Sequence, residues 1–222
     1  MADFRVYNDR TRGDKIMKLK YVLLAALTAL TSLTAETYDK VKITPDISYL
    51  YVYHKGKAVK THRIQNTKHK LTGDYALTYR PGTYIQPIDL KNGVKTIGEV
   101  EVLDFMKDKV NKKKGLIIDV RDRTKYANES LPSAVDIPVK IGKNEGALKK
   151  IFNSLGMQET EGGKWNDDRA MELVVYCDGP WSNESTSMIN ILLKHGYPAN
   201  KIFYYRGGFQ MWKILGFTTV KN

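Results

Sequence analysis

The chain has 222 residues, enough for one good-sized domain and an extension, and its 42% hydrophobic and 27% charged content is ordinary for a soluble globular protein. The net charge is +12, yet no basic stripe is interleaved with aromatic residues, so we expect no nucleic-acid partner. The single cysteine, Cys177, excludes an internal disulfide bond.

The first 35 residues have the parts of a secretory signal. Residues 1–16 look unlike the rest of the chain, and Met17 offers a second start with a basic beginning, although the sequence does not decide between the two starts. The apolar run 21–33 follows, and Ala35 is a small residue at a plausible cleavage point. We expect residues 17–35 to be a signal peptide and the mature protein to be periplasmic, without stable membrane insertion. An uncleaved anchor is the alternative, although the run is short for a bilayer.

Residues 36–93 are predicted to form an N-terminal extension with strand character. The tyrosine-rich stretch 49–53, the turn at Gly56 and the stretch 58–64 predict a β-hairpin, with the tyrosines on its half-buried face. The extension also contains three histidines whose spacing matches no familiar metal-ligand pattern, so we expect them at the surface without a metal: His54, His62 and His69.

From Val94 onward, candidate strands alternate with candidate helices, which predicts an α/β domain over residues 94–222. The pattern indicates a five-stranded parallel sheet with helices on both faces. Residues 157–170 are polar and glycine-rich and are expected to form a surface loop. The expected strands are 95–97, 116–120, 134–138, 173–176 and 201–205, and the expected helices are 100–110, 146–155, 183–195 and 209–215.

Cys177 directly follows the apolar strand 173–176 and precedes a turn and a helix that Ser182 or Asn183 can cap. In a parallel sheet, ligands bind beyond the carboxyl ends of the strands, where Cys177 is expected. Amides of the loop and of the helix N-terminus would favour the thiolate and lower the pKa of the thiol, which predicts a nucleophile. The alternative is an inert buried thiol.

Three segments, LIIDVRDRTKYANESLPSAVDIP, VVYCDGPWS and YYRGGFQMWKILGF, resemble in order and spacing the signature blocks of the rhodanese (sulfurtransferase) family. The resemblance covers about residues 94–222 and implies a sulfur transfer through a persulfide on Cys177, without a cofactor. Thiosulfate or polysulfide would be the donor, and a thiol, sulfide or cyanide the acceptor. The residues that the resemblance assigns to substrate binding are Asp178, Gly179, Pro180, Trp181, Ser182 and Asn183 of the loop. Arg121 and Arg206 are candidates for positive charges at the rim of the pocket, and a surface ion pair is the alternative for each.

Several residues depart from related patterns. Asn183 occupies the position where the related cell-cycle phosphatases carry a phosphate-binding arginine, which argues against a phosphatase. Asp178 would repel a dianionic donor if it faces the substrate, and it is equally compatible with an outward orientation. Pro180 lacks an N–H and so removes one donor from the loop. Asp119 is expected to tie the neighbouring loop by hydrogen bonds.

The expected partners are small anionic sulfur compounds and a persulfide acceptor protein. Without residues 1–35, which carry six basic and three acidic side chains, the net charge is +9, and this excess would steer anions toward a site. One alternative is a non-catalytic module that binds sulfur compounds or a partner, with the extension as its docking element. Another is a carrier that delivers sulfur to a membrane enzyme.

Overall fold

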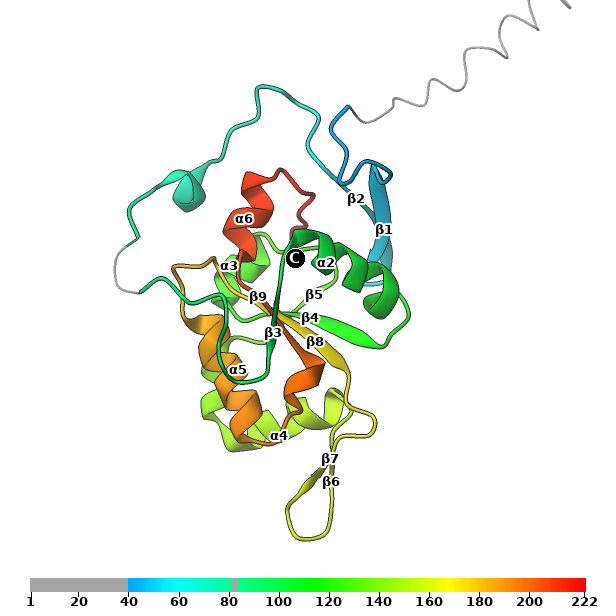
Figure 1. The fold of residues 1–222 in the computed structure, drawn as a ribbon, viewed down its shortest axis with the longest axis vertical. Helices are drawn as coiled ribbons and strands as arrows, with labels where there is room; N and C mark the ends of the chain where they lie inside the picture. Colours follow the sequence, from blue (N-terminus) through cyan, green and yellow to red (C-terminus); the bar gives the residue numbers. More distant parts are fainter. Residues whose placement is uncertain (1–39, 81–83) are drawn as a thin grey trace, which may run out of the picture. The chain divides into compact units, whose positions relative to one another are not determined.

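A central parallel sheet organises the domain in the computed structural model, which describes residues 40–80 and 84–222 (Figure 1). The described residues form the predicted five-stranded sheet in the order β3-β9-β8-β4-β5, with every neighbouring pair parallel. The predictions for residues 1–35 lie outside the described residues. The strands are β3 (Lys95–Ile97), β4 (Gly115–Asp119), β5 (Ala134–Asp136), β8 (Glu172–Tyr176) and β9 (Ile202–Tyr205).

Helices cover both faces of the sheet because the central strands are apolar on both sides. Side chains alternate along a strand, so Val174 and Tyr176 pack toward α2 (Glu99–Phe105) and α6 (Gly208–Ile214). Leu173 and Val175 pack on the opposite face toward α4 (Glu145–Ser154) and α5 (Glu184–Lys194). Further helical segments are η2, a π-helical turn (Met106–Val110), α3 (Arg123–Asn128), η3 (Val139–Lys143) and η4 (Ala199–Lys201).

The N-terminal hairpin is confirmed, but the predicted orientation of its tyrosines is wrong. Strand β1 (Tyr49–His54) pairs antiparallel with β2 (Lys57–His62). The three tyrosines of β1 are 46–61% exposed, whereas Val52 on the opposite face is fully buried. Aliphatic Leu50 and Val52 pack against the cluster beneath α2 and α6, so the alternating tyrosines face away from it.

His54 lies on the buried face of β1, which corrects the surface position predicted for it. Its Nδ1 accepts a hydrogen bond from the Ser133 N–H at 3.2 Å, and its Nε2 donates to Asn222 Oδ1 at 2.8 Å. The neighbouring strand β2 joins the C-terminal tail, because the Thr218 N–H donates to the His62 carbonyl at 3.0 Å. The hairpin is therefore fastened to the last residues of the chain.

Two further segments differ from the sequence-based expectation. The polar stretch 157–170, expected to be a surface loop, contains a short hairpin of β6 (Gln158–Glu159) and β7 (Trp165–Asn166). Beyond β2, the extension runs past α6 and forms the 3₁₀ turn η1 (Gly73–Ala76) on its way to the loop between β8 and α5 (Figure 1). Across the described ranges, no helix combines the length and apolarity required to cross a bilayer.

The buried His54 makes the attachment of the hairpin sensitive to acid. Burial, opposed by the hydrogen bond with Asn222, lowers the pKa of His54 below its ordinary value. The unfolded chain therefore binds a proton more readily than the folded chain, so stability is lost as the pH falls below about 6.5. We expect His54→Gln to reduce the loss of unfolding free energy between neutral and mildly acidic pH, measured by urea unfolding. His69→Gln, at an exposed position, should leave that loss unchanged. An equal loss in wild type and His54→Gln would contradict the assignment.

Candidate functional site

Cys177 lies at the carboxyl end of β8, in the loop that leads into α5, as predicted. The start of α6 holds this loop: the N–H of Phe209 donates to the Cys177 carbonyl at 2.9 Å, and that of Gln210 donates to the Asp178 carbonyl at 2.7 Å. Gly208 has φ +59°, and a Cβ there would lie 2.5 Å from the Cys177 carbonyl oxygen. Only glycine allows α6 to approach the loop so closely.

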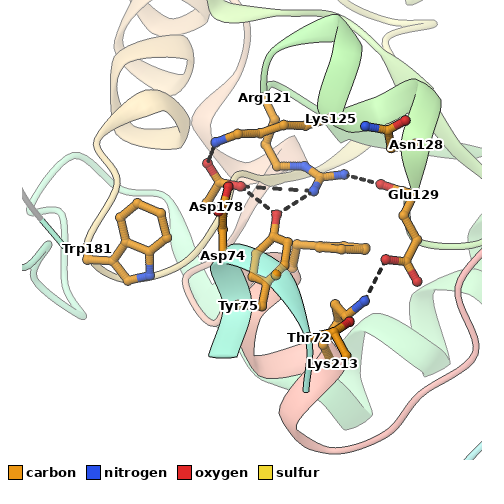
Figure 2. Close-up of a pocket in the computed structure, with 12 residues that line it drawn as sticks. Thr72, Asp74, Tyr75, Arg121, Lys125, Asn128, Glu129, Asp178, Trp181 and Lys213 are labelled. Carbon is orange, nitrogen blue, oxygen red and sulfur yellow. Dashed lines mark hydrogen bonds and ion pairs between the residues drawn. The ribbon is translucent and has the colours of Figure 1, made fainter. Parts of the chain in front are cut away.

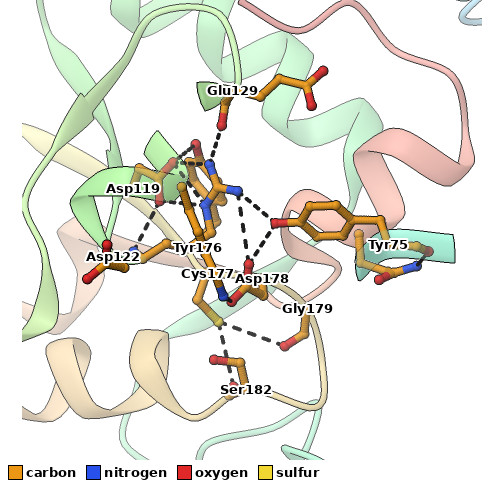
Figure 3. Close-up of polar contacts among 12 residues, drawn as sticks. Tyr75, Asp119, Asp122, Glu129, Tyr176, Cys177, Asp178, Gly179 and Ser182 are labelled. Atoms are coloured by element: carbon orange, nitrogen blue, oxygen red, sulfur yellow. Dashed lines mark hydrogen bonds and ion pairs between the residues drawn. The ribbon is translucent and has the colours of Figure 1, made fainter. Parts of the chain in front are cut away.

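The Cys177 sulfur is enclosed by its own loop. The residue is 1% exposed, and its Sγ lies 3.8 Å from the Gly179 carbonyl oxygen and 3.6 Å from the Ser182 carbonyl oxygen (Figure 3). Because carbonyl oxygens accept hydrogen bonds, these two contacts suit a protonated thiol that donates to them. The loop conformation in the structure therefore holds the thiol rather than the thiolate.

The predicted lowering of the Cys177 pKa is wrong for the loop conformation in the structure, which encloses the sulfur and is called the closed loop below. Burial raises the pKa of the Cys177 thiol, and it outweighs the lowering that comes from the side chains of Ser182 and Ser185 and from the backbone of Ser185 and Gly179. A thiolate loses more hydration free energy on burial than it regains from these neighbouring dipoles. The predicted caps are also weak, since Asn183 makes no capping bond through its side chain and the Glu184 N–H reaches Ser182 Oγ only at 3.5 Å.

A buried ion pair lies beside the cysteine loop. Arg121 Nε is 2.9 Å from Asp119 Oδ1 and Arg121 Nη2 is 2.6 Å from Asp119 Oδ2, and both residues are almost completely buried. The Tyr176 hydroxyl also donates to Asp119, and Arg121 Nη2 donates to the Glu129 carbonyl at 2.6 Å. Burial alone would lower the pKa of Arg121, but Asp119 holds it above its ordinary value. The backbone N–H of Arg121 donates to Asp119 Oδ1 at 3.1 Å, so Asp119 ties its neighbouring loop as expected. Arg121 itself is buried in this ion pair, so the exposed rim charge predicted for it is wrong.

Asp178 faces inward, so the outward orientation considered for it is wrong. The residue is 3% exposed, and its carboxylate lies 2.6 Å from Lys125 Nζ and 4.0 Å from Arg121 Nη1. The Tyr75 hydroxyl from the extension donates to Asp178 Oδ1 at 2.7 Å and accepts from Arg121 Nη1 at 2.9 Å (Figure 2). Two cations and one hydroxyl therefore neutralise the negative charge that follows the cysteine.

A cavity of about 260 Å³ opens beside Asp178, with Tyr75, Phe209 and Trp181 among its walls (Figure 2). Lys125 pairs with Asp178, and Lys213 Nζ lies 2.5 Å from a Glu129 carboxylate oxygen. The charged residues that line the cavity are equally divided between the two signs, with cations on Arg121, Lys125 and Lys213 and carboxylates on Asp74, Glu129 and Asp178. This balance leaves the cavity without a large net positive field.

The other predicted site residues are divided between the cavity and the extension. Trp181 lines the cavity, with the Arg80 guanidinium 4.8 Å from its ring centroid. The Pro180 carbonyl accepts the Gln86 N–H at 2.8 Å. Arg206 Nε donates to the Gln86 carbonyl at 2.8 Å and is not part of the cavity lining, so the structure does not bring Arg206 to Asp178.

Sequence reasoning missed Lys125 and Tyr75. Lys125 belongs to α3, whose start could have been found from Asp122, because the Asp122 side chain caps the helix by accepting the Thr124 N–H at 2.8 Å. Tyr75 meets Asp178 across a separation of 103 residues, for which the sequence carries no local signal. Within the described ranges, no group of three or more His, Cys, Asp or Glu side chains is arranged to hold a metal ion.

A comparison with models of known protein families shows the family of this domain. The sequence model of the Rhodanese-like domain matches residues 102–215, just over half of the chain. Similar solved structures include a rhodanese-like domain from Anabaena sp. (22% identity, 47% of this chain and 97% of that one, TM-score 0.35) and a rhodanese-related protein from Thermoplasma volcanium (19% identity, 57% and 98%, TM-score 0.40). A third is a protein from Helicobacter pylori (17% identity, 60% and 94%, TM-score 0.39). No curated protein matches the chain.

Removing the cation of the buried ion pair should destabilise the fold. Arg121→Met would leave the buried Asp119 carboxylate without its partner, which typically costs about 3–5 kcal/mol. Urea unfolding measures the change. Lys112→Met is the control, because Lys112 and its ion-pair partner Asp108 are both exposed; we expect a loss within about 1 kcal/mol. Equal losses in the two variants would contradict the role assigned to Arg121.

The closed loop should suppress ionisation of Cys177. Because burial raises the pKa of this thiol, we expect its labelling by iodoacetamide to show a higher apparent pKa in the folded protein than in the same chain unfolded in urea. Since the chain has a single cysteine, intact mass gives the labelled fraction directly at each pH. A lower apparent pKa in the folded state would restore the original expectation of an activated thiolate.

Proposed function

Since this chain belongs to the rhodanese-like family, we propose that it is a sulfurtransferase that carries a sulfane sulfur on Cys177. The observation that supports the proposal most directly is the position of Cys177. Its thiol follows the central strand β8 at the carboxyl edge of a parallel sheet, where such sheets bind ligands. The loop residues Asp178 and Trp181 also line a cavity of about 260 Å³, which has room for a small compound.

The proposed reaction has two displacements at sulfur. In the first, the Cys177 thiolate attacks the sulfane sulfur of thiosulfate or polysulfide; an S–S bond forms to Sγ, and the donor leaves with the electron pair of its broken bond. In the second, a thiol, sulfide or cyanide attacks the outer sulfur, and the thiolate of Cys177 leaves. The thiol must release its proton to solvent before the first step, because burial raises the pKa of Cys177 in the closed loop.

The surrounding residues have distinct proposed roles. The Ser182 and Ser185 side chains, which already lower the pKa of Cys177, would stabilise the anion once the loop admits solvent or substrate. Lys125 and Lys213 line the cavity and would contact an anionic donor or acceptor. The remaining loop residues proposed for substrate binding, either through their backbone or as walls, are Asp178, Gly179, Pro180, Trp181 and Asn183. The proposal places the mature protein in the periplasm, on the basis of the sequence of residues 17–35.

A non-catalytic role is the second candidate, and one observation favours it. Cys177 is 1% exposed and its pKa is raised by burial, an arrangement that would suit a module that binds a sulfur compound or a partner without chemistry. A sulfur carrier would use the same persulfide but hand it to one partner. In the enzyme and in the carrier Cys177 gains a sulfur atom, whereas in the binding module it does not.

Incubation with polysulfide or thiosulfate separates these functions. We expect intact mass to rise by one sulfur atom in the wild type and to stay unchanged in Cys177→Ser, in which the only thiol is lost. Thiocyanate release on adding cyanide then measures turnover, which distinguishes an enzyme from a carrier that releases its sulfur only slowly. If neither donor adds sulfur to the folded protein, the sulfurtransferase proposal fails and the binding module takes its place.

A further inference from the structure

The outer side of the cysteine loop is held by the N-terminal extension. We call the two described stretches responsible, residues 72–80 and 84–88, the strap. Its first contact is the Tyr75 hydroxyl, which donates to Asp178 Oδ1 at 2.7 Å, one residue after the cysteine. Its second is the Gln86 N–H, which donates to the Pro180 carbonyl at 2.8 Å. The strap therefore bonds the loop at two of the three positions that follow Cys177.

The strap is fixed in turn to the elements on either side of the loop. Gln210 on α6 donates from Nε2 to the Tyr75 carbonyl at 2.9 Å and accepts from Arg80 Nη2 at 2.9 Å. On the other side, Thr186 of α5 donates to Gln86 Oε1 at 3.0 Å, and Arg206 Nε donates to the Gln86 carbonyl at 2.8 Å. The loop is consequently bracketed between α6 and α5 by the same segment.

The strap has its polar groups inside and its apolar side chains outside. The Tyr75 ring packs edge-on against Phe209 at a centroid distance of 5.1 Å, but most other large apolar side chains of the strap face water. Burial of apolar surface therefore contributes little to holding it, and hydrogen bonds supply much of the attachment. A segment attached in this way can detach without opening the core. The outward side chains are 58–90% exposed and are Leu77, Tyr79, Tyr84, Ile85 and Ile88.

We propose that the strap locks the Cys177 loop closed and that its release is the step that gives sulfur compounds access to Sγ. The chemistry that would use this access rests on the proposed function, whereas the lock itself is a property of the fold. In the closed loop, the Gly179 and Ser182 carbonyls occupy the surroundings of the sulfur. Opening requires Asp178 to leave Tyr75 and Pro180 to leave Gln86, and hence requires the strap to move.

Tyr75 is the positioning residue of this lock (Figure 2). Its hydroxyl is the one strap group that contacts both the loop carboxylate of Asp178 and the buried cation of Arg121. Burial raises the pKa of Tyr75, so the hydroxyl remains a neutral donor across the physiological range. Tyr75→Phe removes these two bonds and keeps the ring against Phe209, while Lys125 still neutralises Asp178.

The test is the rate at which iodoacetamide labels Cys177 in the whole chain, followed by intact mass. We expect Tyr75→Phe to label about tenfold faster than the wild type, since a hydrogen bond to a charged group holds the closed state. Arg80→Ala removes the contacts of the strap with Gln210 Oε1 and with the Trp181 ring without touching the Tyr75 hydroxyl, and it should also label faster. Tyr79→Phe is the matched control: it makes the same chemical change in the same segment at a residue that is 78% exposed, and its rate should equal that of the wild type.

The urea dependence of the labelling rate separates release of the strap from unfolding of the domain. Opening of the strap exposes little surface, so the labelling rate of Tyr75→Phe should depend only weakly on low urea concentrations. Labelling that requires global unfolding would instead follow the full dependence of the unfolding free energy on urea. The apparent pKa of labelling should also fall in Tyr75→Phe, because the opened thiol regains solvent.

Two results would overturn the lock: equal labelling rates in Tyr75→Phe and Tyr79→Phe, or acceleration that carries the full urea slope of unfolding. Alkylation needs no sulfur transfer, so this outcome is independent of the proposed activity. Faster labelling without any persulfide formation would retain the lock and refute the sulfurtransferase.

Discussion

The ion pair between Asp119 and Arg121 is the interaction on which the functional end of this domain depends. Both side chains are almost completely buried, and a charge in that environment is tolerated only when its partners satisfy it fully. Tyr176 on β8 supplies one such partner, and the carbonyl of Glu129 another. The pair thereby fixes the ends of two central strands relative to each other, and Cys177 is the next residue after one of them.

The same ion pair extends into the cysteine loop as a series of alternating charges. From Arg121 the contacts lead through the Tyr75 hydroxyl to Asp178 and then to Lys125, so each charge faces one of opposite sign. This arrangement neutralises the carboxylate beside the cysteine, and it leaves less unpaired positive charge to attract an anion. An inorganic dianion therefore meets a balanced site rather than a cationic one.

Enclosure of the sulfur creates opposing requirements. A covered thiol is protected from the medium, but it is also held protonated, because a thiolate loses more hydration on burial than the loop dipoles replace. Under the proposed lock, chemistry at Cys177 requires a change of loop conformation. The extension is well placed to govern that change, since the hairpin is joined to the C-terminal tail and the strap to α6 and α5. Most large apolar side chains of the strap are exposed, so burial of apolar surface contributes little to holding it.

The sequence by itself determined the elements whose signals are local. Short apolar runs separated by helical periodicity predicted the five parallel strands and placed Cys177 at the carboxyl end of β8, and the turn at Gly56 predicted the hairpin. These predictions succeeded because strand alternation and turn chemistry act over a few residues. The cap at Asp122 is an equally local signal for α3.

Only the tertiary structure decided which face of the hairpin is buried, how Asp178 is oriented and in which direction the pKa of Cys177 shifts. Each depends on contacts between distant segments: Tyr75 meets Asp178 across 103 residues, and Val52 packs against helices that follow much later in the chain. The helix and loop dipoles near Cys177 could be anticipated from the sequence, but the depth of its burial could not. Desolvation is set by everything that packs around an atom, and for this sulfur it outweighs the local field.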